Sequence, residues 1–364
     1  MIEPRALVLV EPGRFELRRF PRPDIHDDDG LLRVEACGLC GTDHEQYTGL
    51  LAGGFAFVPG HETIGVIEDI GAAAAARWGV RPGDRVAVEV FQSCGRCAAC
   101  AADEYRRCER HGLRDMYGFV DVREPPGLWG GYATHQYLAP DSLLLPVPDH
   151  LDPIDATLFN PLGAGVRWGA SLAPTRPGDV VAVLGPGVRG LSAVASAKHA
   201  GAGFVMLTGV GPNDEPRLRL GANFGADLTV DVARRDPVPA LRGAAGGLAD
   251  VVVDVTANAP AAFAQAVALA RPGGTVVVAG TRGSREAPGF QPDDVVLKEL
   301  RVLGALGVDT TAYRAAFDLL ATGALPFDRV PRQVAGFDGL EALLARMSGQ
   351  GSEPPPVHAV FVPD

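Results

Sequence analysis

Four cysteines of the sequence have the spacing of metal ligands. Cys94, Cys97, Cys100 and Cys108 fall within fifteen residues, in the run CGRCAACAADEYRRC. Four thiolates at this spacing can surround one tetrahedral zinc ion and leave no open position for a substrate. We therefore expect a structural zinc lobe at about residues 94–108, which stabilises its loop by binding metal and does no chemistry itself.

The other two cysteines stand in a different pattern. Cys37 and Cys40 belong to ACGLCGTDH, and His61 and Glu62 follow in PGHETIGVI. A thiolate and an imidazole are two of the three protein ligands that an open, catalytic zinc site needs. A histidine before a strand is more often structural, so GHE alone is a weak signal. Its combination with the cysteines makes it much more specific.

A dinucleotide-binding motif begins at Gly185. The stretch DVVAVLGPGVRGLSAVASAKHAG reads as a strand, a G-x-G-x-x-G turn and a helix that starts near Val188, a context typical of cofactor binding. Gly185 would permit the tight turn, Gly187 the approach of backbone to pyrophosphate, and Gly190 close packing of helix on strand. Arg189 opposes the helix dipole unless an anion binds there. Contact with a cofactor phosphate and extension into solvent both remain open for it.

The next strand of this region carries information on the cofactor. It ends at Thr208 and Gly209, where enzymes that prefer NAD place an acid for the adenosine ribose. Asp214 and Glu215 come five residues later, in what reads as an unusually long loop. Two arginines follow these acids: Arg217 and Arg219. They can bind a 2′-phosphate or form a solvated helix face, so NAD and NADP both remain open, with a slight preference for NADP.

The elements that must position these residues form two domains. The chain has 364 residues, more than one hydrophobic core usually supports. The first ~150 residues contain short β-type runs broken by Gly and Pro, which indicates a barrel-like β unit. Beyond Pro174, apolar strands alternate with helices, the pattern of a doubly wound parallel sheet. We expect domains at 1–157 and 158–308 and a C-terminal segment at 309–364.

Composition excludes several classes of function. The net charge is −11 without any basic stripe, so nucleic acid is not an expected partner. No apolar run reaches the roughly 18 residues of a membrane span, and the start does not read as an export signal. Six cysteines in such a chain indicate thiolates and metal in a reducing cytoplasm rather than disulfides.

These motifs together resemble the zinc-dependent medium-chain dehydrogenase/reductase superfamily, the alcohol, sorbitol and glucose dehydrogenases. The resemblance covers nearly the whole chain and implies a GroES-like catalytic domain, a Rossmann domain, and a C-terminal segment that returns to the catalytic domain. It implies that Cys40 and His61 bind a catalytic zinc and that Glu62 is an exchanging or outer ligand. It also implies that Thr42 relays the substrate proton. His44 would be a further step of that relay, or else an ordinary surface histidine.

The chain departs from this family at the third zinc ligand. Polyol-type relatives carry a glutamate there and alcohol-type relatives a cysteine nearby, whereas LFNPLGAGVRWG places Asn160 in that position. Zinc held by Cys40, His61 and Asn160 with help from Glu62 is one interpretation. A vestigial site, with its side chains merely packed, is the other.

The predicted function is reversible hydride transfer between NAD(P) and a secondary alcohol or polyol and its ketone, assisted by zinc. A zinc-independent NADPH reductase of an activated C=C or C=N bond is an alternative, and a nonenzymatic nucleotide-binding protein is another. Trp129 and Trp168 either line the substrate cleft or pack in the core. The resemblance also implies a homodimer or homotetramer, formed where the last Rossmann strand, within 299–307, pairs with its copy.

Overall fold

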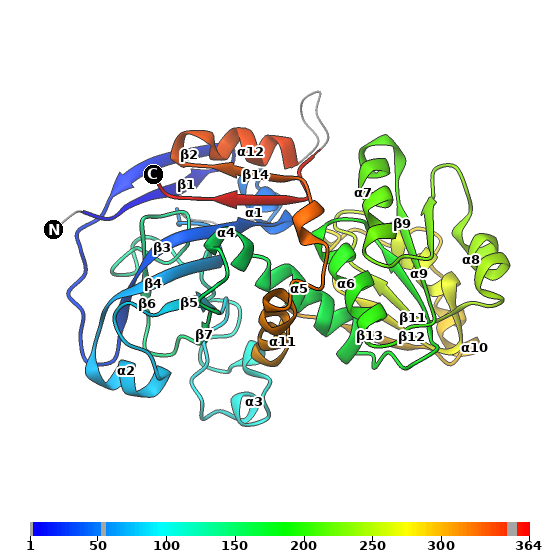
Figure 1. The fold of residues 1–364 in the computed structure, drawn as a ribbon, viewed down its shortest axis with the longest axis horizontal. Coiled ribbons are helices and arrows are strands. Elements are labelled where there is room, and N and C mark those ends of the chain that lie inside the picture. The colour runs from blue at the N-terminus through cyan, green and yellow to red at the C-terminus, as the bar shows by residue number, and fades with distance from the viewer. Residues whose placement is uncertain (1–2, 52–55, 348–354) are drawn as a thin grey trace. The chain divides into compact units, whose positions relative to one another are not determined.

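A computed structural model describes residues 3–51, 56–347 and 355–364. The chain divides into two compact units (Figure 1). The first contains residues 1–159 and 331–364, so the C-terminal segment returns to the N-terminal domain. The second contains residues 160–330. Across the described ranges, no helix is both long and apolar enough to cross a lipid bilayer.

The first unit is built on a seven-stranded sheet with the order β14-β15-β3-β4-β5-β7, and β6 also pairs with β3. Its strands are β3 (Gly30–Leu39), β4 (Glu62–Ile70), β5 (Arg85–Val88), β6 (His135–Leu138), β7 (Leu144–Pro146), β14 (Arg332–Ala335) and β15 (His358–Phe361). A separate hairpin joins β1 (Arg5–Glu11) to β2 (Arg14–Arg19). The predicted β-type runs are therefore strands, and β3 forms its long antiparallel pair with β4 because both carry apolar residues into the core.

Short helices connect these strands. They are α1 (Gly41–Tyr47), α2 (Ala72–Trp78), α3 (Ala98–Ala101), α4 (Pro153–Ala156) and α12 (Leu340–Met347). The alanine run at 72–76 forms most of α2, since alanine is the best helix former, and Gly79 ends this helix with a left-handed φ of 66°. The packing of α12 extends the apolar core around β15, which ties the C-terminal segment to this unit.

The second unit is a six-stranded parallel sheet with the order β10-β9-β8-β11-β12-β13. Its strands are β8 (Val180–Leu184), β9 (Phe204–Gly209), β10 (Leu228–Asp231), β11 (Ala249–Asp254), β12 (Ala270–Val278) and β13 (Arg301–Gly304). In sequence order this arrangement is 3-2-1-4-5-6, the doubly wound dinucleotide-binding topology, in which the strand order reverses between β8 and β11. The predicted fold class is confirmed.

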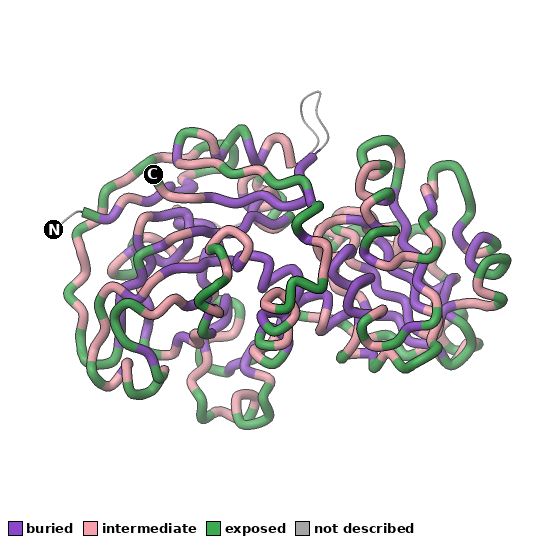
Figure 2. Tube along the Cα trace, viewed as in Figure 1, coloured by how far each residue is buried: buried purple, intermediate pink, exposed green. Residues whose placement is uncertain are grey.

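The helices that follow or join these strands are α5 (Phe159–Val166), α6 (Val188–His199), α7 (Gly211–Asn223), α8 (Pro237–Ala245), α9 (Ala261–Leu269), α10 (Pro292–Leu297) and α11 (Thr310–Ala321). Of these, α6, α7, α8 and α9 pack against the sheet. The central strands are buried along most of their length while the outer helix faces are exposed (Figure 2). Continuous apolar strands result from this burial on both faces, as the sequence texture predicts.

Two details differ from the sequence-based predictions. Residues 309–330 group with the second unit, where we expected them in the returning segment, because α11 packs beside Gly163 of α5 through Tyr313. The long loop predicted after β9 is wrong as well. Only Val210 separates β9 from α7, and Asp214 and Glu215 lie within the helix. The two prolines of this segment, at 212 and 216, obscured its helical pattern.

Candidate functional site

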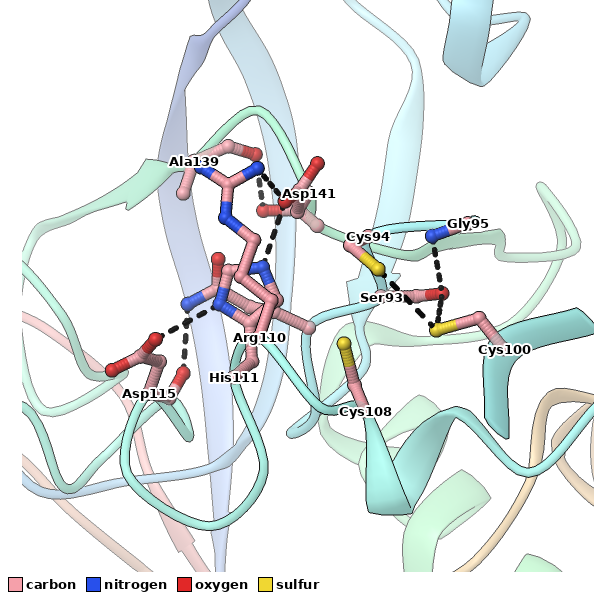
Figure 3. A network of polar contacts seen from close by, with 12 residues as sticks. Ser93, Cys94, Gly95, Cys100, Cys108, Arg110, His111, Asp115, Ala139 and Asp141 are labelled. Atoms are coloured by element: carbon pink, nitrogen blue, oxygen red, sulfur yellow. Dashed lines mark hydrogen bonds and ion pairs between the residues drawn. The ribbon is translucent and has the colours of Figure 1, made fainter. Parts of the chain in front are cut away.

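The four-cysteine lobe brings its sulfurs together. Each of the four offers a ligand atom within 4.8 Å of the others, and those of Cys94, Cys100 and Cys108 face one another in Figure 3. The sulfur pairs lie 3.9 Å apart for Cys94 and Cys100 and 4.0 Å apart for Cys97 and Cys108. Four sulfurs bound to one zinc ion at about 2.3 Å lie about 3.8 Å apart, so the residues fit the ion.

The local electrostatics of this lobe suit a cation. Burial raises the pKa of Cys108, but N–H groups of Cys94, His111 and Arg110 outweigh that effect and lower the pKa to about 6. Burial raises the pKa of Cys100 to about 11, so this thiol needs a positive ion beside it to become a thiolate at neutral pH. The arrangement therefore favours binding of a metal ion over four independent thiols.

A polar network attaches the lobe to the neighbouring chain (Figure 3). His111 lies between two carboxylates, with Nδ1 2.9 Å from Asp115 and Nε2 2.7 Å from Asp141. Arg110 also pairs with Asp141, at 3.2 Å. A cavity of about 560 Å³ lies beside this network. Trp129, for which the sequence left the substrate cleft and the core both open, is part of the wall of this cavity and also packs in an apolar cluster. These contacts fix the shape of the lobe.

The second predicted metal site is assembled from three buried residues. Cys40 Sγ lies 3.2 Å from His61 Nε2, and Glu62 brings a carboxylate oxygen within 4.8 Å of both. The sequence places Cys40 and His61 21 residues apart, yet the structure directs them at one point. Thiolate, imidazole and carboxylate are all zinc ligands, so this donor set fits the metal.

The sheet explains why these side chains meet. Cys40 follows β3 directly and His61 precedes β4, and the register of this antiparallel pair sets Gly38 opposite Glu62. A Cβ on Gly38 would lie 2.4 Å from Glu62 Oε2, so only glycine leaves room for the carboxylate. Gly60 turns the chain into His61 with a φ of +90°, a conformation that glycine adopts readily.

The cap of α1 orients the thiolate. Cys40 is the N-cap residue, and its sulfur accepts the N–H of Thr42 at 3.3 Å. Asp43 Oδ2 accepts the N–H of Cys40 at 2.8 Å, while its Oδ1 lies 3.6 Å from His61 Nδ1. Carboxylates in this position fix the ring orientation of metal-binding histidines. Sequence reasoning missed this role for Asp43, although its place three residues after Cys40 is that of a capping box.

The two residues of the predicted proton relay lie on α1. Thr42 and His44 are both partly exposed on this helix. Burial lowers the pKa of His44, so its ring is neutral at pH 7 and can accept a proton. The thiol at Cys37 does not share this chemistry, because its burial raises its pKa well above the ordinary value.

The predicted dinucleotide turn has the expected backbone. Gly185 adopts a φ of +102°, and a Cβ on Gly190 would lie 1.8 Å from the carbonyl oxygen of Gly185. A Cβ on Gly187 would meet no atom within 4 Å, which leaves its backbone open to approach. Gly187 is also the N-cap of α6, which begins at Val188. The geometry thus supplies a helix N-terminus of the kind that binds phosphate.

Arg189 and Asn160 contact each other within the second unit. Arg189 Nη2 donates to Asn160 Oδ1 at 2.9 Å, and the guanidinium carbon lies 5.8 Å from the ring centre of Trp168. The amide nitrogen of Asn160 donates to the hydroxyl of Tyr313, also at 2.9 Å. Trp168 is held in turn by the carbonyl oxygen of Gly307. Sequence reasoning did not anticipate that the predicted third ligand would bind Arg189.

Two family descriptions match the chain, namely the alcohol dehydrogenase GroES-like domain over residues 26–149 and the zinc-binding dehydrogenase over residues 189–322. The chain is 68% identical over 360 residues to Probable alcohol dehydrogenase adh of Mycobacterium tuberculosis (strain ATCC 25618 / H37Rv), covering 99% of this chain and 98% of that protein. It is 30% identical over 323 residues to the sorbitol dehydrogenase of Bacillus subtilis (strain 168), covering 88% and 86% respectively.

Solved structures share the architecture. A zinc-binding dehydrogenase of Sinorhizobium meliloti 1021, bound to NADP, is similar with a TM-score of 0.84 at 30% identity, covering 100% of both chains. The benzyl alcohol dehydrogenase of Acinetobacter calcoaceticus has a TM-score of 0.87 at 22% identity, also over 100% of both chains, which is a likeness of fold alone. These matches confirm the prediction of a GroES-like domain with a Rossmann domain.

Proposed function

The chain belongs to the zinc-dependent medium-chain dehydrogenase superfamily, and from this premise we propose that it interconverts a secondary alcohol or polyol and its ketone with NAD(P). The predictions of the family, of an enzyme, and of an NAD(P)-dependent alcohol dehydrogenase that requires zinc are confirmed. Its likeness to an alcohol dehydrogenase and a sorbitol dehydrogenase supports a small hydroxylated substrate. The site residues below are proposals.

The observation that supports this proposal most directly is that the ligand atoms of Cys40, His61 and Glu62, all buried residues, lie close together. We assign the catalytic zinc to these three side chains. When bound, zinc supplies a Lewis acid that polarises the substrate oxygen. Asp43 Oδ1 lies 3.6 Å from His61 Nδ1, so its charge faces the ring edge opposite Nε2 and would favour the orientation in which Nε2 is directed at the metal.

Asn160 remains the position that departs from the family. Its Oδ1 already accepts a hydrogen bond from Arg189. Sharing one neutral amide oxygen between a guanidinium and zinc would bring two cations together, which is unfavourable. We therefore propose that Glu62, an anion, serves as the third protein ligand in place of Asn160.

Thr42 and His44 are the proposed path for the proton of the alcohol. Thr42 carries a hydroxyl that can donate and accept at once. His44 lies two residues further along α1, and its lowered pKa keeps the ring neutral and able to receive a proton. The proton would then leave from His44 to solvent, since this side chain is only partly buried.

The cofactor half of the site is proposed at the turn formed by Gly185, Gly187 and Gly190. The N–H groups at the start of α6, from Val188 and Arg189, would face the pyrophosphate. Arg189 donates to Asn160, so its charge stays near this helix start. Thr208 and Gly209 end β9, where the adenosine ribose binds in this topology.

Metal analysis tests the proposal together with turnover. Purified protein should hold two zinc ions per chain and oxidise secondary alcohols or polyols with NAD(P). Glu62→Gln should lose one zinc, whereas Asn160→Ala should keep both. Full activity after selective removal of one zinc would instead support the zinc-independent reductase. Cofactor binding without turnover on a panel of alcohols and ketones would support the nonenzymatic alternative.

A second copy of the chain is the proposed partner, at the edge of the parallel sheet. β13 is the last strand of that sheet, and among the residues that the structure describes it pairs with β12 alone. Val296 and Leu297, just before it, are 73% and 80% exposed, and Val302 and Leu306 are also exposed. Exposed apolar groups beside an open strand edge favour pairing with another strand. Light scattering should give a dimer or tetramer, which Leu297→Asp should weaken and Leu113→Asp, on the lobe, should not.

A reducing, cytoplasmic setting is also proposed. Four cysteines, Cys94, Cys97, Cys100 and Cys108, have the geometry of one metal site, and Cys40 lies with His61 and Glu62 in a second possible site. Cysteines placed as metal ligands rather than as disulfides are typical of reducing compartments. Fractionation of cells that express the protein with its natural sequence would test this location.

A further inference from the structure

The end of β9 is where the dinucleotide topology reads the adenosine ribose. No acid stands there in the sequence, because the strand ends at Thr208 and Gly209. The structure nevertheless brings a carboxylate to this place from the next element. α7 begins after Val210 alone, and its first turn carries Asp214.

Two contacts fix the position of Asp214. Its Oδ2 accepts the N–H of Val210 at 2.9 Å, which turns the carboxylate back toward the strand end. A Cβ built on Gly209 would lie 2.9 Å from the Cβ of Asp214 and 2.9 Å from the Cγ of Pro186. Pro186 belongs to the glycine-rich turn. The carboxylate, the end of β9 and the phosphate-binding turn therefore meet at one point.

Two N–H groups that could hold a phosphate here already bond to acids. Asp214 takes the N–H of Val210, and Asp231, at the end of β10, takes the N–H of Gly211 at 2.9 Å. The N–H groups of Gly211 and Ala233 keep the pKa of Asp231 below its ordinary value. A 2′-phosphate would thus face two carboxylates and no spare donor on these two amides.

The nearby arginines are turned toward these acids. Arg217 Nη1 lies 3.5 Å from Asp214 Oδ1, and Arg234 Nε lies 3.5 Å from Asp231 Oδ2. Arg219 pairs with Glu215 at 2.8 Å, and both side chains are more than half exposed. These three arginines therefore lie in ion pairs with acids in this structure. In the sequence alone these acids read as part of a loop, and the cofactor preference stayed open with a slight preference for NADP.

We propose that Asp214 determines cofactor specificity, by accepting hydrogen bonds from the ribose hydroxyls of NAD and repelling the 2′-phosphate of NADP. This inference rests on the proposed function, since it concerns the cofactor of the same reaction. It replaces the slight preference for NADP that the sequence indicated. In the usual arrangement the acid that binds the ribose stands at the end of the second strand. Here the proposed acid, Asp214, comes instead from the first turn of the following helix.

Calorimetric titration with NADH and NADPH, without substrate, tests the proposal. The wild type should bind NADH more tightly by roughly tenfold or more. Asp214→Asn should reduce that ratio by roughly 10- to 100-fold, mainly through tighter NADPH binding, because like charges placed together are strongly unfavourable. Glu215→Gln is the matched control, one residue away on the same helix, and should leave the ratio unchanged. The pair 5′-ADP and 2′,5′-ADP should reproduce the pattern.

Three results would overturn the inference. One is a wild type that binds NADPH more tightly than NADH. Another is an Asp214→Asn variant, folded by circular dichroism, with the same ratio as the Glu215→Gln variant. The third is loss of NADPH binding alone in Arg217→Ala, which would make Arg217 a phosphate ligand. Failure of the wild type to bind either dinucleotide would be different, because it would remove the proposed function itself.

Discussion

The two proposed metal sites of the first unit are built in opposite ways. The four-cysteine lobe takes all its ligands from fifteen consecutive residues, and three of its four cysteines are partly exposed. The Cys40 site joins the end of β3 to the start of β4, and its three ligands are all buried. One site depends on local spacing and sulfur alone. The other depends on the register of a sheet and mixes three kinds of donor.

This difference indicates that the lobe needs a metal ion to fold and that the Cys40 site does not. The lobe contributes few apolar side chains, mainly Tyr105, which packs with Val90 and Phe91. We therefore propose that its shape depends on a bound ion together with the polar network. Cys40 and His61 lie instead beside a sheet whose core is already extensive. Their geometry should persist without metal, as an open catalytic site requires.

The largest effect is expected in the lobe. Cys97→Ser should remove the structural zinc and lower the free energy of unfolding by about 4 kcal/mol, the range reached when a structural metal is lost. Urea unfolding and metal analysis measure both quantities. Cys37→Ser, at a buried thiol outside both sites, is the control and should keep two zinc ions. A Cys97→Ser protein of wild-type stability would show that the lobe folds without its ion.

Cys40→Ser should separate chemistry from stability. Serine is also a good N-cap, so α1 should remain, and the unfolding midpoint should stay near that of the wild type. Turnover should fall by at least about 100-fold, since even outer-sphere partners of a metal reach that size. Retention of both zinc ions, or a loss of only a few-fold, would contradict the assignment of Cys40.

Asp43→Asn tests a feature that is specific to the Cys40 site. The proposed ligands of the lobe are four cysteines, so no carboxylate orients a histidine ligand there. The amide can still accept the N–H of Cys40, but it no longer carries charge toward His61. Zinc affinity at the catalytic site should fall by about 10- to 100-fold, measured by competition with a chelator. Asp69→Asn, on the exposed end of β4, is the control and should leave the zinc affinity unchanged. An Asp43→Asn variant with the same zinc affinity as the Asp69→Asn variant would count against the role of Asp43.

The smallest effect is expected at His44. Its lowered pKa keeps the ring neutral to a lower pH than the ordinary value of about 6.5. The rate of alcohol oxidation should therefore fall only when the pH drops below the lowered pKa of His44, because the ring then carries a proton and can no longer accept one from the substrate. His44→Gln should remove this inflection and cost roughly tenfold or less, since direct general acid–base groups contribute about 100-fold or more. An unchanged pH profile would place the proton path elsewhere.

Predictions succeeded where the signal was local. The spacing of the four cysteines, the strand–turn–helix around Gly185 and the alternation of strands and helices each lie within a short window of sequence. The prediction failed after β9, where Pro212 and Pro216 read as a loop. Pro212 fits the first turn of α7, where N–H groups have no partner within the helix, whereas Pro216 lies inside the helix, a position that proline rarely takes.

The sequence by itself determined the types of ligand, the presence of a dinucleotide turn and the class of fold, because each follows from short-range spacing and side-chain chemistry. Only the tertiary structure decided which distant groups meet. The β3–β4 register brings Glu62 against Gly38, Arg189 engages the amide of Asn160, and α7 returns the carboxylate of Asp214 to the end of β9. The first two contacts depend on the packing of segments that are well separated in the chain, which no local pattern encodes. The third joins residues only four positions apart and depends on α7 beginning directly after β9, which the prolines of this segment obscured.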